Sequence, residues 1–156
     1  MEIRDAVPGD EAQIATVLRR SIRALCVDDH NNDDAILNLW LRNKTAANVL
    51  SWIQTQTVLV ASERNVIVGV AAASEAGEVL SNYVDPSARF TGVSTALLET
   101  LEVRLAGTGI GVVHLVSTRT ALRFYNDRGY SDSGSPEEWA GLTGFPMKER
   151  FTPQLA

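Results

Sequence analysis

The chain has 156 residues, of which 45% are hydrophobic and 21% charged, and its formal net charge at pH 7 is −5. This length and balance predict one globular domain, 1–156, whose core is large enough to be stable without a disulfide or a metal. The single cysteine, Cys26, has no partner for an internal disulfide, and His30 and His114 lie far apart in sequence, which argues against a structural metal.

The N-terminal residues lack the features of a signal peptide, and no apolar run approaches the length of a membrane helix. We therefore expect a cytoplasmic protein. An acidic chain without a basic cluster is not expected to bind nucleic acid as its main partner, because phosphate contacts provide most of that affinity. The negative charge mildly favours cationic substrates.

The first third of the chain predicts a strand followed by helices. Residues 2–7 alternate as a strand does, and a helix capped by Asp10 follows. Residues 26–32 are polar and turn-prone, which predicts a loop. Two short helices are expected next, one starting at Asp33 and one with Thr45 as its N-cap.

The middle of the chain predicts a hairpin and then a strand, a loop and a helix. Two β-rich runs at 57–62 and 66–74 have a short polar connection between them. An alternating strand at 78–84 leads into a loop at 85–92, and a helix with an apolar stripe covers 93–106.

The last third predicts a buried strand, a helix and a final strand. The buried strand is expected at 112–116, and the helix runs from Thr118 as N-cap to Gly129 as C-terminal stop. We expect a loop from 132 to 144 and a last strand near 145–151.

The loop at 85–92 has the composition of an anion site. Asp85-Pro86 ends the strand, because proline lacks an N–H and has a fixed φ, and Gly92 lets another backbone or ligand come close. A helix N-terminus after such a loop presents free N–H groups and the positive end of the helix dipole, which suits phosphate.

The residues of this loop resemble a known motif. The order Arg89-x-x-Gly92-x-Ser94 resembles the acetyl-CoA pyrophosphate loop of the GNAT N-acetyltransferase superfamily, which reads Gln/Arg-x-x-Gly-x-Gly/Ala. The chain departs from it at Ser94, which adds one oxygen to the alanine that the family tolerates. It also has Phe90-Thr91 where the family often has a basic residue and a second glycine.

A second stretch resembles the same family. The GNAT pattern Ala-x-x-Phe/Leu-Tyr-x-x-x-Gly-Phe/Tyr is matched at Ala121, Phe124, Tyr125, Gly129 and Tyr130. An amphipathic helix with an aromatic core stripe explains Phe124 and Tyr130 equally well. It does not explain two motifs in the family's order with a strand between them.

The resemblance covers about residues 2–151 and is strongest from 78 to 130. It implies a GNAT fold of the α/β (α+β) class, with a central mixed, mostly antiparallel sheet of about seven strands and helices on both faces. It also implies direct attack of a primary amine of a small molecule or peptide on acetyl-CoA, the co-substrate. Homodimers are common among such proteins.

The resemblance also assigns donor-binding residues. Pantetheine would lie between the strand ending near Val84 and the strand ending near Ser117, bound by backbone groups around Tyr83 and Val84. The residues implied in donor binding are Tyr83, Val84, Arg89, Phe90, Thr91, Gly92, Val93, Ser94 and Thr95.

Two residues are candidates for proton transfer. Tyr125 lies where the family places the residue that protonates the departing CoA thiolate, although it could instead only pack on the pantetheine. Glu78 lies eleven residues before Arg89, the spacing at which histone-acetylating members carry a glutamate base. The alternatives for Glu78 are an exposed residue near a turn, with the proton passing through water, or another carboxylate such as Glu75.

Acceptor recognition in this family comes from the first helices, where Arg23 and His30 are candidate substrate-binding residues. A loop histidine is more often solvated, and Trp40 and Trp52 are expected in the core. The sequence does not name the acceptor. The rival hypotheses are an idle acyl-CoA sensor module and an interaction domain that uses the acidic first third. Tyr125 favours the enzyme, because neither rival needs a proton donor.

Overall fold

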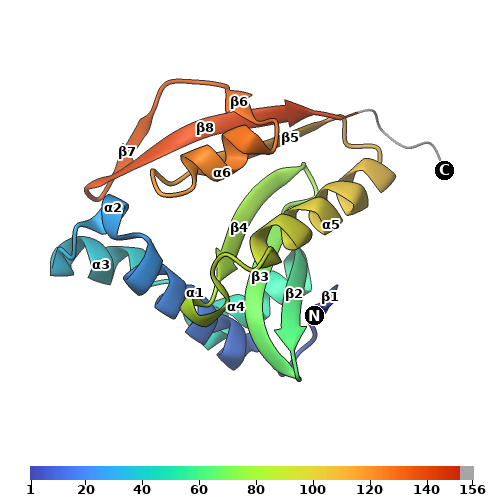
Figure 1. The fold of residues 1–156 in the computed structure, drawn as a ribbon, viewed down its shortest axis with the longest axis horizontal. Coiled ribbons are helices and arrows are strands. Elements are labelled where there is room, and N and C mark those ends of the chain that lie inside the picture. Colours follow the sequence, from blue (N-terminus) through green and yellow to red (C-terminus); the bar gives the residue numbers. More distant parts are fainter. Residues whose placement is uncertain (152–156) are drawn as a thin grey trace.

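One twisted sheet organises the protein, and the computed structural model describes it over residues 1–151 (Figure 1). Over these residues eight strands pair in the order β1-β2-β3-β4-β5-β8-β6, with β7 paired to β8. The strands are β1 (Glu2–Asp5), β2 (Thr57–Glu63), β3 (Val66–Ala73), β4 (Glu78–Val84), β5 (Val112–Ser117), β6 (Ser131–Asp132), β7 (Glu137–Trp139) and β8 (Leu142–Arg150). Only β4 and β5 pair in parallel, so the expected mixed, mostly antiparallel sheet is confirmed.

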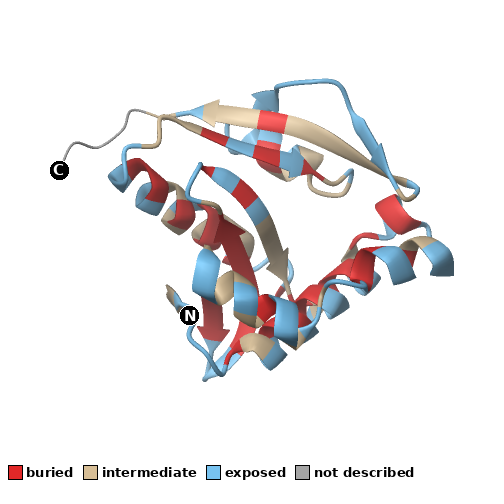
Figure 2. Cartoon of the chain, turned by 180° about the vertical axis from the view of Figure 1, so that it is seen from behind, coloured by how far each residue is buried: buried red, intermediate tan, exposed pale blue. Residues whose placement is uncertain are grey.

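Helices cover both faces of the sheet. They are α1 (Glu11–Leu25), α2 (Val27–His30), α3 (Asp34–Leu41), α4 (Ala46–Thr55), the 3₁₀ helix η1 (Pro86–Ala88), α5 (Val93–Gly107) and α6 (Leu122–Asp127). Leu59 and Ala61 of β2 pack in one core cluster with α5, whereas Val58 and Val60 pack in another with α1 and α4. Because both faces are covered, β2 and β3 are apolar almost throughout, and most of their residues are buried (Figure 2).

A glycine sets how closely α5 approaches the sheet. A Cβ on Gly69 of β3 would lie 2.6 Å from Val93 Cγ1 and 2.9 Å from Leu97 Cδ1, both on α5. Only a residue without a side chain allows this contact. The start of α5 is therefore held directly against the central strands.

A β-bulge in β4 lies next to the point where β4 and β5 separate. Ala73 of β3 pairs with Val79, but Ala72 pairs with Ser81, so Leu80 is an extra residue in β4. A bulge bends its strand and shifts the alternation of side chains by one position. β4 pairs with β5 at only two positions, Glu78 with His114 and Val79 with Leu115, and the two strands diverge beyond them.

The helix starts agree only partly with the sequence prediction. Asp33 and Thr45 cap α3 and α4, accepting hydrogen bonds from Ile36 N at 3.1 Å and Asn48 N at 3.2 Å. Asp10 is the N-cap residue of α1, as predicted, but its side chain makes no capping hydrogen bond. Its carboxylate instead accepts from Arg4 Nη1 at 2.8 Å and from the Val7 N–H, and the bond from Arg4 lowers the pKa of Asp10.

Two predicted loops contain regular structure. Residues 26–32 include the single helical turn α2, which ends at Asn31 in the left-handed conformation. Residues 132–144 include β7, whose three residues are exposed and carry no alternating pattern; it pairs with β8 through the backbone and through a hydrogen bond from the Thr143 hydroxyl to Glu138. No helix in residues 1–151 has both the length and the apolar character needed to cross a membrane.

Candidate active site

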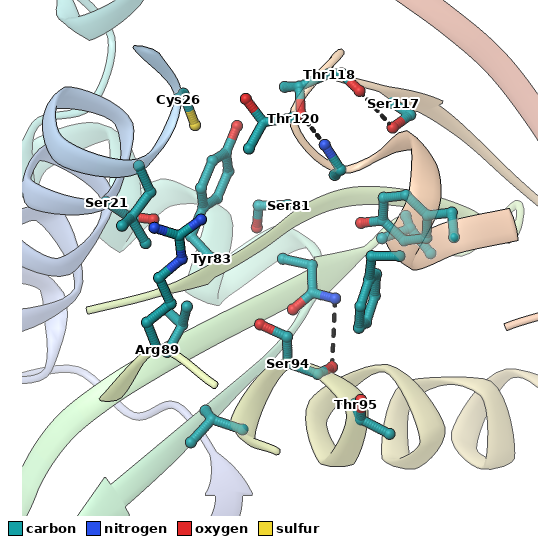
Figure 3. Close-up of a pocket in the computed structure, with 18 of the residues that line it drawn as sticks. Ser21, Cys26, Ser81, Tyr83, Arg89, Ser94, Thr95, Ser117, Thr118 and Thr120 are labelled. Carbon is teal, nitrogen blue, oxygen red and sulfur yellow. Dashed lines mark hydrogen bonds between the residues drawn. The ribbon is translucent and has the colours of Figure 1, made fainter. Parts of the chain in front are cut away.

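A cavity of about 460 Å³ opens where β4 and β5 diverge (Figure 3). Its walls come from β4, the start of α5, the end of β5, the turn into α6, and the C-terminal end of α1. Figure 3 shows Ser94 and Thr95 of α5 on one side and Ser117, Thr118 and Thr120 on another. Two stretches that are far apart in sequence therefore enclose one space.

Backbone edges face this cavity from both strands. Residues 81–84 of β4 pair with β3 on one side only, and Val116 and Ser117 of β5 pair only with β8. Their other edges have no strand partner among the described residues. An extended ligand that carries amides can hydrogen-bond to such edges.

The loop before α5 is fixed by side-chain contacts. Asp85 accepts hydrogen bonds from the Ser87 N–H at 3.0 Å and from Arg20 Nε at 2.7 Å. Gly92 is the N-cap of α5 with a left-handed φ of 84°, and no side chain caps the helix. The N–H groups of the first turn are therefore free to bind an anion.

Phe90, one of the residues at which the loop departs from the GNAT motif, has an unusual backbone conformation. It has a φ of 63° and is 89% exposed, and the Arg89 guanidinium lies 4.5 Å from the centroid of its ring. A bulky residue is rarely found in this left-handed region, and glycine is favoured there. The second glycine that the family often has would fit this conformation without strain.

Tyr125 of α6 lies in the cavity wall and is only 7% exposed. Its ring makes edge contacts with Phe124 and Tyr130, whose centroids lie 5.2 and 5.6 Å away. Burial raises the pKa of Tyr125 to about 12, and the Asn82 side chain partly opposes this rise. The hydroxyl therefore stays protonated at neutral pH and above.

Asn82 of β4 is a site residue that the sequence prediction missed. Its side-chain Nδ2 donates to the Ser94 carbonyl at 3.4 Å, which is marked by a dashed line in Figure 3. Its Oδ1 is buried without a hydrogen-bond partner. A polar residue inside a strand would be the sequence signal for such a site residue. Because Ser81 of β4 is also polar, this signal alone does not single out Asn82.

Asp29 of α2 was also missed. Its Oδ1 accepts from the Arg119 N–H at 2.6 Å, and its Oδ2 accepts from the Thr120 N–H at 3.1 Å and from the Thr120 hydroxyl. The carboxylate is 7% exposed. It joins α2 to the turn that leads into α6, across 90 residues of sequence.

His30 is not available to a substrate in this structure, which contradicts both the predicted contact and the solvated alternative. It is 0% exposed, its Nε2 bonds to the Ile22 carbonyl at 2.9 Å, and its Nδ1 accepts from the Asn32 N–H at 3.0 Å. Both ring nitrogens are thus used inside α1 and α2. Because Nδ1 accepts, the proton lies on Nε2.

Arg23 and Glu78 lie outside the cavity wall. Arg23 is exposed in the last turn of α1, and Glu78 is exposed at the first position of β4, before the strands diverge. The bulge at Leu80 separates Glu78 from the β4 residues that line most of the cavity. The eleven-residue spacing therefore does not bring Glu78 into this wall.

The side chains on the α1 side of the cavity are shielded from solvent. Cys26 is 5% exposed, and burial raises the pKa of its thiol to about 12, so it is not an activated nucleophile. The Tyr83 phenol points to the same side in Figure 3, and burial raises its pKa above its usual range. Over residues 1–151, no cluster of three His, Cys, Asp or Glu side chains suits a metal ion.

A family model described as an acetyltransferase (GNAT) domain matches residues 28–151. The chain belongs to the GNAT acetyltransferase family. The match includes both stretches that border the cavity. The sequence resemblance is confirmed, and so is the fold class that it implied.

Solved GNAT structures share the fold over nearly the whole chain. A GCN5-related N-acetyltransferase from Rhodopseudomonas palustris has a TM-score of 0.87 at 23% identity, covering 96% of this chain and 95% of that one. The PaiA N-acetyltransferase from Thermoplasma acidophilum, solved with coenzyme A, has a TM-score of 0.83 at 18% identity, covering 96% and 98%. The aminoglycoside 6'-N-acetyltransferase from Enterococcus faecium has a TM-score of 0.74 at 16% identity, covering 100% of both chains. No curated protein matches the chain by sequence.

Proposed function

We propose that this GNAT protein is an N-acetyltransferase that moves an acetyl group from acetyl-CoA to a primary amine of a small molecule or peptide. The observation that carries the proposal is the cavity between β4 and β5, which brings free strand edges, a helix N-terminus and a buried tyrosine hydroxyl together. The coenzyme A complex of the T. acidophilum relative supports the choice of donor.

The residues present fit a CoA thioester. The first-turn N–H groups of α5 and the backbone of 89–95 would bind the pyrophosphate, and the free edge at Tyr83 and Val84 would bind the pantetheine amides. The unpaired Asn82 Oδ1 is an additional acceptor in the same wall. A long donor that carries phosphates at one end and amides along its length matches these groups in order.

Acetyl-CoA supplies an activated thioester that an amine can attack directly. In the proposed reaction the chain holds and orients the donor, and Tyr125 donates its hydroxyl proton to the leaving sulfur. Burial keeps that proton in place, since the pKa of Tyr125 is about 12. The alternative role, in which the ring only packs on the pantetheine, needs no hydroxyl.

The proton lost by the amine is proposed to leave through water. No Asp, Glu or His side chain is among the described residues that line the cavity. Glu78 is therefore dropped as the base in this proposal. Turnover should rise with pH as the acceptor amine loses its proton, because only the neutral amine is a nucleophile.

Donor binding is the first test. Acetyl-CoA at a hundred times its dissociation constant should stabilise the protein by about 2.7 kcal/mol, measured as a rise in melting temperature. Gly92→Glu brings a negative charge to the phosphate site and should abolish the rise. The matched control is Gly109→Glu, at a glycine that also has a left-handed φ, 89°, and whose added Cβ would meet no atom within 4 Å; it should keep the rise.

Turnover is the second part of the test. A panel of small amines, amino acids, polyamines and peptide N-termini should release free CoA thiol from acetyl-CoA with at least one member. Absence of the thermal shift in the wild-type protein would overturn the proposal. Binding without turnover would instead support the acyl-CoA sensor, and a CoA-insensitive stoichiometric protein partner would support the interaction domain.

A further inference from the structure

The cavity between β4 and β5 is lined by one charged side chain within residues 1–151, that of Arg89. Its other lining residues are apolar or carry neutral hydroxyl, amide, phenol or thiol groups. Two nearby carboxylates are already occupied: Asp29 accepts from backbone N–H groups of the turn into α6, and Asp85 accepts from the Arg20 guanidinium. The cavity wall therefore carries a positive charge that no acidic lining residue balances.

The Arg89 side chain is directed away from the start of α5. Figure 3 shows it extending from its loop toward Ser21 of α1, whereas Ser94 and Thr95 mark the first turn of α5 in another part of the wall. The side chain is exposed, and none of the ion pairs within residues 1–151 includes it. Its charge is thus available to a ligand at the α1 end of the cavity.

The ring of Phe90 holds this guanidinium in place. The guanidinium carbon of Arg89 lies 4.5 Å from the centroid of the Phe90 ring, and Phe90 itself has a φ of 63°. Bulky residues in this strained conformation are found at ligand sites, where the strain has a use. Stacking on an aromatic face orients the plane of a guanidinium and leaves the N–H groups at its edge free.

A guanidinium held in this way is suited to a carboxylate. Its planar fork of N–H donors matches the two carboxylate oxygens with two parallel hydrogen bonds. The hydroxyl of Ser21, a buried residue in the same part of the wall, is a further hydrogen-bonding group there. The pyrophosphate of the donor is the rival anion, but the N-terminus of α5 offers it a separate set of N–H groups.

We propose that Arg89, held by the ring of Phe90, binds a carboxylate of the acceptor, so that the acceptor is a small amine with a carboxylate, such as an amino acid. This inference rests on the proposed acetyl transfer. The chain's net charge of −5 mildly favours a cationic acceptor, but net charge describes the whole surface rather than one pocket. A polyamine would meet the like charge of Arg89 and no carboxylate among the described lining residues.

Paired acceptors that differ only in the carboxylate provide the first test. Each amino acid that is turned over is compared with its carboxamide, and spermidine is the cationic probe. The wild-type kcat/KM should be at least about tenfold higher for the amino acid, because its amide lacks the charged partner of the guanidinium. The amine of the amide loses its proton more easily, so this preference cannot come from amine reactivity. A higher kcat/KM for spermidine than for every amino acid would overturn the inference.

Removing the guanidinium should remove the preference. In Arg89→Gln the ratio of kcat/KM for the amino acid to that for its amide should fall to within about threefold of one, through a higher KM for the amino acid. Stabilisation by acetyl-CoA should persist, because backbone groups are proposed to bind the pyrophosphate. Arg23→Gln, at an exposed arginine of α1 outside the cavity wall, is the matched control and should keep the wild-type ratio. An unchanged ratio in Arg89→Gln would overturn the inference.

The contribution of the ring is tested by Phe90→Gly. Glycine adopts a left-handed φ without strain, whereas it also makes the unfolded chain more flexible. These effects oppose each other, so the melting temperature without ligand should change little. The ratio of kcat/KM for the amino acid to that for its amide should fall about three- to tenfold, because the guanidinium is no longer held. An unchanged ratio would overturn the part of the inference that concerns Phe90.

A binding measurement gives a second readout that needs no turnover. N-acetylglycine should raise the melting temperature of the CoA-saturated wild-type protein, and N-acetylglycinamide at the same concentration should not. Arg89→Gln should lose this difference, and Arg23→Gln should keep it. If CoA fails to bind the wild-type protein, the proposed function falls and this inference falls with it. If CoA binds and amines are acetylated without regard to a carboxylate, only the role of Arg89 is overturned.

Discussion

The proposed donor side and the proposed acceptor side of the cavity are built in different ways. The donor side, formed by β4, α5, β5 and α6, presents backbone groups at two strand edges and one helix start. The proposed acceptor side is the C-terminal end of α1, and α2 behind it is fixed by buried side chains such as Asp29 and His30. Backbone sites require particular residues at fixed short spacings, whereas side-chain closure can join residues at any distance along the chain.

The largest expected effect is on the donor side, at Tyr125. Tyr125→Phe keeps the ring and removes only the hydroxyl, so kcat should fall by about 10²–10⁴ with little change in the KM for acetyl-CoA. In the wild-type enzyme, this group should cause no alkaline loss of rate below about pH 11, because its pKa is about 12 and the rate falls only as the phenol ionises. Steady-state kinetics across pH measure both, and a fall in kcat of less than about fivefold would mean that another group protonates the sulfur.

An intermediate effect is expected where the two sides are joined, at Asp29. Asp29→Asn keeps the shape but turns an acceptor into a donor that faces the N–H groups of Arg119 and Thr120. Unfolding in urea should show a loss of roughly 2–3 kcal/mol, as expected for hydrogen bonds to a charged group. Asp28→Asn, at the exposed neighbouring residue, should change stability by less than about 0.5 kcal/mol; equal effects in the two variants would contradict the joining role.

The smallest effect on catalysis is expected on the acceptor side, at His30. His30→Leu removes the partners of the Ile22 carbonyl and the Asn32 N–H, so stability should fall by roughly 1–3 kcal/mol. Below the melting temperature, kcat and the acceptor KM should stay near the wild-type values. His114→Leu, at an exposed position of β5, is the matched control, and a raised acceptor KM with unchanged stability would restore His30 as a substrate contact.

This difference explains what could be predicted from the sequence. The fold class and the family could be predicted from two local motifs. The loop from Arg89 to Ser94 borders the cavity, and it could be found from the sequence because its conformation depends on residues close together in the chain. Asn82 and Asp29 could not be identified, since their partners Ser94 and Thr120 lie 12 and 91 residues away. His30 was misinterpreted because polar neighbours suggested a loop, whereas a single helical turn buries it.

The extra residue Leu80 in β4 links the shape of the cavity to the backbone of one strand. Removing it would restore regular pairing with β3, with Asn82 still opposite Ala71 and Tyr83 still opposite Val70, so both side chains would keep their faces. β4 would instead lose the bend that a bulge gives its strand, next to the point where it diverges from β5. An insertion or deletion here would therefore act on the cavity through the backbone, and the bulge is a design variable for re-engineering the enzyme.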